Sequence, residues 1–184
     1  GYEGRLRTGP ERATAVSDAR ATLRECATGF QHAGLSLDVV SVGGTSTMRD
    51  WQGEGFVTEI QAGSYAFMEH DLDGLGLPFE SAAWVRATVI SMHGQRALVD
   101  AGRKIIGCEY GPPRAIGIDA SVCSVSEEHC VLAGHAVKTL TRGQVIRLRP
   151  SQIRTTFNLH DSVWLKDGQG LYVSAPVAAR GAST

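Results

Sequence analysis

A run of branched apolar residues that breaks into two glycines is the feature that most constrains this chain. Three valines within residues 39–42 precede Gly43 and Gly44, and hydroxyl residues occupy positions 45–47. Glycine adopts positive φ without strain, so backbone N–H groups can converge in such a turn while hydroxyls add donors. We expect a buried strand that opens into a phosphate-binding loop; a plain strand-to-turn exit is the alternative. The candidate phosphate-binding residues are Gly43, Gly44, Thr45 and Ser46.

The composition excludes several classes of partner. The 184 residues are 42% apolar and 20% charged, with a net charge of −1 and no basic block. Neither a nucleic-acid surface nor a membrane surface is therefore predicted, and no apolar run approaches the roughly 18 residues of a membrane span. No leader pattern is visible, so we expect a cytoplasmic location. The cysteines lack a Cys-x-x-Cys spacing and are expected to be free thiols: Cys26, Cys108, Cys123 and Cys130.

The first part of the chain follows the pattern of a parallel β/α unit. Apolar residues recur at helical spacing over residues 11–33, with Pro10 at the start and Gly34 as the expected end. A further short strand is expected over residues 56–60. The turn-rich segment 70–78 is the best domain boundary, so the predicted domains are 1–75 and 76–184.

From residue 82 onward the apolar period changes to two. No long helical pattern intervenes, and turn signals separate the apolar runs, so this part is predicted to be an all-β module of about a hundred residues. The expected strands cover residues 84–90, 97–100, 121–125, 144–148, 155–159, 163–166 and 172–176.

Short motifs along the whole chain occur in the order seen in one enzyme family. They are Gly-Tyr-Glu-Gly at 1–4, Val-Gly-Gly-Thr-Ser-Thr at 42–47, Gly-Ser-Tyr-Ala-Phe at 63–67, Asp-Ala-Gly-Arg-Lys at 100–104, Ser-Glu-Glu-His at 126–129 and Ala-Arg-Gly at 179–181. Their order resembles that of the D-threonine aldolase and eukaryotic-type D-serine dehydratase family. The resemblance implies α/β plus all-β architecture: the C-terminal part of a (β/α)8 barrel that holds pyridoxal 5'-phosphate, followed by a β-sandwich or barrel-like domain.

The resemblance also implies a partner. A complete barrel takes about 250 residues, and the family's Schiff-base lysine lies near the first barrel strand, which has no counterpart here. The chain's lysines, Lys104, Lys138 and Lys166, match no such position. We therefore expect pyridoxal phosphate to be shared with a second polypeptide that carries the N-terminal barrel half and the lysine, in an assembly that dimerises further. Tyr65 is a further candidate for the cofactor phosphate, or a packing residue at the barrel rim.

The metal site of the family is altered in this chain. Related enzymes carry His-x-Cys or His-x-Asp just after the proline that matches Pro150, where this chain has Gln152 and Arg154. Glutamine is a poor metal ligand and arginine is none, so a divalent metal is not expected. Arg154 is predicted to bind a substrate carboxylate or hydroxyl, or to be a surface remnant. His129 is the candidate proton-handling group, with a structural role as the alternative.

The resemblance favours a lyase or aldolase that acts on a small amino acid. Loss of the metal leaves two alternatives open. One is racemisation or another proton transfer at Cα, which needs no hydroxyl-binding metal. The other is a non-catalytic scaffold subunit.

Overall fold

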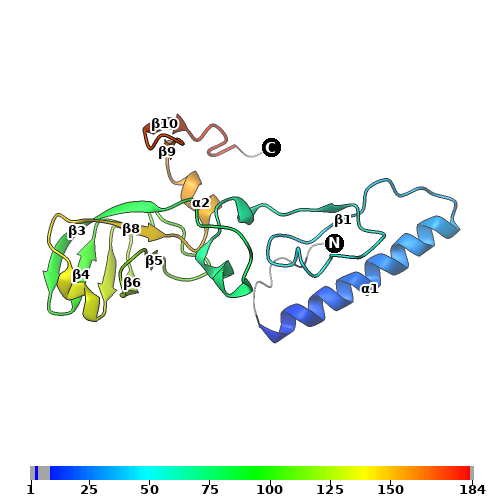
Figure 1. Ribbon diagram of the computed structural model, residues 1–184, viewed down its shortest axis with the longest axis horizontal. Coiled ribbons are helices and arrows are strands. Elements are labelled where there is room, and N and C mark those ends of the chain that lie inside the picture. Colours follow the sequence, from blue (N-terminus) through cyan, green and yellow to red (C-terminus); the bar gives the residue numbers. More distant parts are fainter. Residues whose placement is uncertain (1–2, 4–8, 183–184) are drawn as a thin grey trace. The chain divides into compact units, whose positions relative to one another are not determined.

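The chain divides into two compact units, Gly1–Glu80 and Ser81–Thr184 (Figure 1). The computed structural model describes Glu3 and residues 9–182. The motif at 1–4 therefore lies outside the described residues except for Glu3, and the expected domain division at 75/76 stays a prediction. Within the described ranges, no helix is long and apolar enough to cross a membrane.

The first unit begins with a long helix, α1, over Pro10–His32. Proline fits the first helical turn because its missing N–H needs no partner there. At the other end, Gly34 has φ of +70°, its N–H donates to the Gln31 carbonyl at 3.0 Å, and the Leu35 N–H donates to the Phe30 carbonyl at 3.0 Å. This pair of bonds is a Schellman motif. The predicted helix is confirmed at both ends.

Two very short parallel strands follow α1. Strand β1 covers Ser41–Val42 and pairs with β2, Glu59–Ile60, in a parallel register. Val42 is fully buried, but the side chain of Val39 is 64% exposed. The prediction of a buried strand beginning at the first valine is therefore wrong. Val39 precedes the paired part of the ladder and has no packing layer over it.

The remainder of the first unit consists of turns and 3-10 helices. These are η1, Ser64–Ala66, and η2, His70–Leu75, which ends at Gly76 in the left-handed conformation. The segment expected to be a turn-rich connector thus contains a short helix. Few of the unit's described apolar residues are buried; they are Val16, Ala27, Val42, Trp51, Met68 and Leu72.

A six-stranded sheet forms the second unit, in the order β5-β8-β3-β4-β7-β6. Every paired strand is antiparallel, and the two edge strands, β5 and β6, also contact each other, so the sheet is nearly closed into a barrel. The strands are β3, Val85–His93; β4, Arg96–Val99; β5, Arg114–Ala115; β6, Ser121–Val125; β7, Cys130–Ala133; and β8, Val145–Arg149. The prediction of an all-β module is confirmed, although β5 and β7 were not expected.

Alternation along the strands supplies the core of this sheet. In β3, for example, Val85, Ala87 and Val89 are buried while Arg86 between them is exposed. The 3-10 helix η3, His135–Thr139, lies against β4 and adds buried Val137. The core also includes Ala97, Val99, Ala101, Ile106, Val122, Cys130, Leu132, Leu140, Ile146 and Leu148.

A short helix, α2, links the sheet to a separate hairpin (Figure 1). It covers Ile153–Asn158, so the strand predicted over 155–159 is wrong. Local capping favours the helix, because the Gln152 side chain accepts from the Arg154 N–H at 3.3 Å, and the Thr156 hydroxyl donates to the Gln152 carbonyl at 2.6 Å. The hairpin consists of β9, Ser162–Lys166, and β10, Tyr172–Pro176, as expected.

Candidate functional site

The loop after β1 is a tight, buried turn. Gly43 has φ of +64°, whereas Gly44 is not in the left-handed region, so only one of the two glycines uses that freedom. The turn closes on itself: the Thr47 N–H donates to the Gly44 carbonyl at 3.1 Å, and the Gly44 N–H donates to the Thr47 hydroxyl at 3.2 Å. The loop is therefore ordered by its own backbone and hydroxyl groups.

Thr45 joins this loop to the segment after β2. Its hydroxyl oxygen accepts the Gly63 N–H at 3.2 Å and the Tyr65 N–H at 3.0 Å. Two backbone donors thus converge on one oxygen beside the glycine turn, which is the pattern of an anion nest. The structure brings all five predicted cofactor-binding residues together. Tyr65 is 43% exposed, and the centroid of its ring lies 5.2 Å from that of the Phe79 ring.

Arginines of α1 hold the far side of the loop, and the sequence analysis missed them. Arg12 donates to the Ser46 carbonyl at 2.7 Å and forms an ion pair with Asp50. Arg20 donates to the Asp50 carbonyl and pairs with Glu54 at 2.7 Å. The only sequence signal for these contacts is a row of arginines on the helix. The loop is thus fixed between α1 and the segment after β2.

A phosphate group fits this arrangement, although a complete cofactor site is not contained in it. The Gly63 and Tyr65 N–H groups that converge on Thr45 are donors suited to phosphate oxygens. The first unit contains no lysine for the cofactor aldehyde, because Lys104, Lys138 and Lys166 all belong to the second unit.

His129 lies in the tight turn between β6 and β7. Its N–H donates to the Ser126 hydroxyl at 3.2 Å, and its carbonyl accepts the Ser126 N–H at 2.8 Å. This turn packs on Gly102, where a Cβ would come within 2.4 Å of the Glu127 carbonyl oxygen and of the His129 nitrogen. Only glycine allows so close an approach, which explains two of the matched motifs together.

Titratable groups near this turn show three pKa shifts. A hydrogen bond from Lys104 lowers the pKa of Glu128, whose side chain is exposed. Burial raises the pKa of Cys130 to about 12 and also raises the pKa of Cys108. Because a thiolate is the reactive form of cysteine, these two thiols are inert at neutral pH.

Arg154 is exposed on α2 and is oriented by Gln152. Its backbone N–H and its Nε both donate to the Gln152 Oε1, at 3.3 and 3.2 Å, and Gln152 is 4% exposed. This helix packs on the segment at Gly107, whose N–H donates to the Thr156 hydroxyl at 2.9 Å. The amide oxygen is thus occupied by arginine donors, so the pair does not fit a metal ion.

The described residues contain no group of three or more histidine, cysteine, aspartate or glutamate side chains able to hold a metal ion. The expected lack of a metal stays a prediction. The turn that carries His129 contacts Gly102, and Thr156 of α2, the helix that carries Arg154, contacts Gly107.

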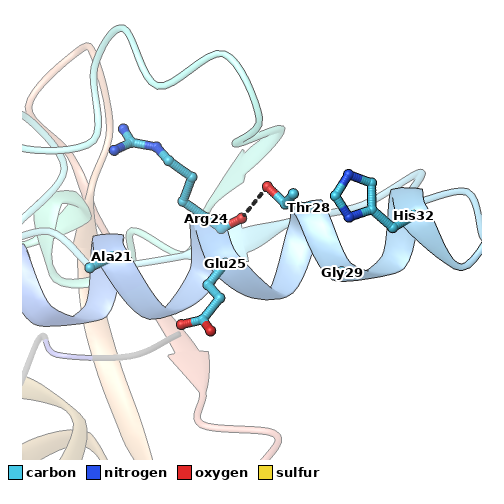
Figure 2. A pocket seen from close by; sticks show the side chains of 6 residues that line it. All are labelled: Ala21, Arg24, Glu25, Thr28, Gly29 and His32. Carbon is cyan, nitrogen blue, oxygen red and sulfur yellow. Dashed lines mark hydrogen bonds between the residues drawn. The ribbon is translucent and has the colours of Figure 1, made fainter.

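A shallow hollow lies on one face of α1 (Figure 2). Figure 2 shows that the charged side chains of Arg24 and Glu25 point in opposite directions, so they do not converge on a ligand. Arg24 is also paired with Glu54 at 2.6 Å. We assign no ligand to this hollow, which is lined by Ala21, Arg24, Glu25, Thr28, Gly29 and His32.

Comparison with known proteins identifies relatives of both units. Residues 82–165 match the family described as "Putative serine dehydratase domain". The chain is 36% identical over 171 residues to a D-threonine aldolase of Arthrobacter sp, covering 88% of this chain and 45% of the relative. It is 31% identical over 184 residues to a 3-hydroxy-D-aspartate aldolase of Paracoccus denitrificans (strain Pd 1222), covering 93% and 47%. The chain spans about half the length of the curated relatives it matches.

Solved structures confirm the predicted fold class. The crystal structure of D-threonine aldolase from Filomicrobium marinum has a TM-score of 0.86 and 29% identity, covering 98% of this chain and 52% of that one. The D-threo-3-hydroxyaspartate dehydratase from Delftia sp. HT23 has a TM-score of 0.75 at 24% identity, covering 94% and 53%, which shows the fold alone. An alanine racemase-like protein from Idiomarina loihiensis, at 19% identity and a TM-score of 0.74, shares the same fold.

Proposed function

This chain corresponds to the C-terminal half of the D-threonine aldolase and D-serine dehydratase-like family, and on that premise we propose that it anchors the cofactor phosphate of a pyridoxal-phosphate-dependent lyase. The proposed substrate is a small β-hydroxy D-amino acid, as the names of its relatives suggest. Pyridoxal phosphate, when bound, supplies the electron sink for cleavage at Cα. This chain contributes binding and orientation.

The observation that carries the proposal is the convergence at Thr45. The Gly63 and Tyr65 N–H groups meet one oxygen beside the Gly43 turn. A phosphate oxygen offers the same acceptor chemistry with more charge, so it can take these hydrogen bonds or share them with the hydroxyl. Ser46 lies on the same turn, held through its carbonyl by Arg12.

A second polypeptide is proposed to supply the Schiff-base lysine and the rest of the barrel. The chain has no lysine before Lys104 and spans about half the length of its relatives. The first unit also exposes the apolar side chains of Phe30, Leu35 and Val39, which a barrel half would cover. The four cysteines are free, which supports placing this assembly in the reducing cytoplasm.

Arg154 is proposed to bind an oxygen group of the substrate. Gln152 fixes the Nε side of its guanidinium, and no carboxylate of the described residues forms an ion pair with its terminal nitrogens. A fork with this freedom suits a planar carboxylate. His129 is the proposed proton-handling group, since its imidazole belongs to the turn held on Gly102.

Gln152 and Arg154 together favour a second candidate function, racemisation. Cleavage or elimination at a β-hydroxyl gains from a metal ion that activates that group, and Gln152 with Arg154 does not fit one. Racemisation at Cα needs no such ion. Product analysis of the assembled protein with D-threonine, D-serine and D-alanine distinguishes the two: aldehyde or keto-acid products support the lyase, and an L-amino acid alone supports the racemase.

The phosphate site is tested by comparing pyridoxal phosphate with pyridoxal on the assembled two-chain protein. Both aldehydes react with a lysine, so the ratio of their affinities isolates the phosphate contribution. The wild type should prefer pyridoxal phosphate. Gly43→Ala should abolish the preference, because its Cβ would lie 3.0 Å from Thr47 and Trp51 atoms at a φ of +64°.

The matched control for this variant is Gly143→Ala in the second unit. Gly143 also has a positive φ, +86°, but no atom lies within 4 Å of its Cβ position. It should therefore lose stability without losing the preference. A wild type that binds the two aldehydes equally well would refute the phosphate site.

A further inference from the structure

Trp51 lies directly against the glycine turn. The side chain is 2% exposed, and a Cβ built on Gly43 would come within 3.0 Å of its Cδ1 and Nε1 atoms. The edge of the indole that carries the N–H therefore limits the space beside the Gly43 backbone. Thr47, whose hydroxyl accepts the Gly44 N–H, is equally close to that Cβ position.

A buried carboxylate fixes this indole. The Trp51 Nε1–H donates to the Glu3 Oε1 at 2.9 Å, and Glu3 is only 8% exposed. No hydrogen-bond partner of Glu3 Oε2 is found among the described residues. A buried polar oxygen that lacks a hydrogen bond is costly to stability, so packing alone does not account for a carboxyl group at this position. Such a group calls for a role beyond stabilising the fold.

The face of the Trp51 indole is also in contact with a charged side chain. The guanidinium of Arg20 lies 5.8 Å from the centre of the Trp51 ring, in the range of a cation–π contact. Arg20 also pairs with Glu54, so its position is itself fixed. The indole is thereby constrained in two directions while its N–H edge faces Gly43.

We propose that Glu3 is a positioning residue for the cofactor phosphate and acts through Trp51. Its carboxylate orients the indole, the indole supports Gly43 at φ of +64°, and the turn presents its donors to the phosphate. This inference rests on the proposed function. It assigns to Glu3 the role of a hydrogen-bond acceptor and not of a charge that contacts the cofactor.

The test measures affinities of the assembled protein for pyridoxal phosphate and for pyridoxal. Glu3→Leu removes the acceptor, and Trp51→Phe removes the donor while keeping an aromatic ring. Each should lower the ratio of the two affinities about tenfold, which is the effect of one charge-assisted hydrogen bond. The double variant should lose no more than either single variant, because both break the same bond.

The Glu3→Gln variant distinguishes a residue that positions Trp51 from one whose charge contacts the cofactor. The glutamine amide oxygen still accepts from the indole N–H, so this variant should keep the wild-type ratio within about twofold. Trp164→Phe, on the exposed hairpin, is the matched control and should leave the ratio unchanged. Thermal unfolding of each variant checks that it is folded; if Glu3→Leu does not fold, Trp51→Phe carries the test.

Three outcomes are decisive. A reduced ratio in Trp51→Phe with rescue in Glu3→Gln supports the inference. A wild-type ratio in Trp51→Phe, or a Glu3→Gln variant as weak as Glu3→Leu, overturns it while the phosphate site stands. A wild type with no preference for pyridoxal phosphate refutes the proposed function itself, and this inference with it.

Discussion

The contacts that stabilise each unit internally differ between the two units of this chain. Ser81–Thr184 buries a continuous apolar core within a nearly closed sheet. The described part of Gly1–Glu80 has two strands of two residues each, few buried apolar residues, and a set of arginine contacts from α1. The second unit thus resembles an independent domain, whereas the first is ordered largely by polar contacts around one loop. A unit that is ordered by polar contacts around one loop, as Gly1–Glu80 is, gains most from a partner that covers its apolar residues.

The largest expected difference appears when the units are separated. Residues 81–184 should fold cooperatively alone, because their core lies within one sheet. Residues 1–80 should remain unfolded or aggregate, since Phe30, Leu35 and Val39 are exposed and the strands have open edges. Far-UV circular dichroism and amide chemical-shift dispersion check both pieces. A well-dispersed spectrum from residues 1–80 would contradict the comparison.

A second prediction concerns Gly102, where the turn of His129 packs. The Cβ of Gly102→Ala would lie 2.4 Å from two backbone atoms, so we expect a loss of about 2 kcal/mol in the free energy of unfolding. Gly168→Ala is the matched control, because its Cβ position has no neighbour within 4 Å and its φ is not positive. Urea unfolding measures both. Equal stabilities would show that the turn is not held on this segment.

Alkaline pH should weaken the second unit through Cys130. Its pKa is raised from 9.0 to about 12 in the folded state, so the protonated thiol is the form that folding favours. Above pH 9 the unfolded chain loses this proton first, and stability falls as pH rises toward 12. By pH 10 the loss should reach about 1 kcal/mol relative to Cys130→Ala. Urea titrations at pH 8, 9 and 10 check this; parallel curves for the two proteins would contradict it.

The smallest expected effect is local to the first unit. Arg20→Met removes contacts to the Asp50 carbonyl and to Glu54, and should cost about 1 kcal/mol or less, because the ion pair is only partly buried. Hydrogen exchange should quicken over residues 46–56 and nowhere in the second unit. Arg142→Met, at an exposed turn, is the control. Unchanged exchange in the loop would show that α1 does not order it.

Sequence patterns predicted the elements whose signals are local. Residues 121–125 and 172–176 were expected as strands and are β6 and β10, because β-branched and aromatic residues between turn signals specify them. The ends of α1 followed from Pro10 and Gly34. In α2 the signal was misleading: Thr155 and Thr156 favour strands, but the Gln152 side chain caps a helix instead.

The glycine turn of the candidate site was predictable from the sequence, but its hydrogen-bond partners were not. Gly43 was identified from chemistry that only glycine allows, and its positive φ is observed. The role of Thr45 differs from the expected donor, since it accepts from residues 18 and 20 positions later, a pairing that depends on the register of β1 and β2. Trp51 was missed for the same reason, because its contacts with Glu3 and Gly43 are tertiary.

The burial of Trp51 has a practical consequence for spectroscopy. The three tryptophans differ in solvent access: Trp51 is 2% exposed, Trp84 is 37% exposed and Trp164 is 69% exposed. A collisional quencher such as acrylamide reaches Trp84 and Trp164 and quenches most of their emission. The light that persists comes from the indole beside Gly43, so the intrinsic fluorescence of the quenched protein is a built-in reporter of the surroundings of that turn.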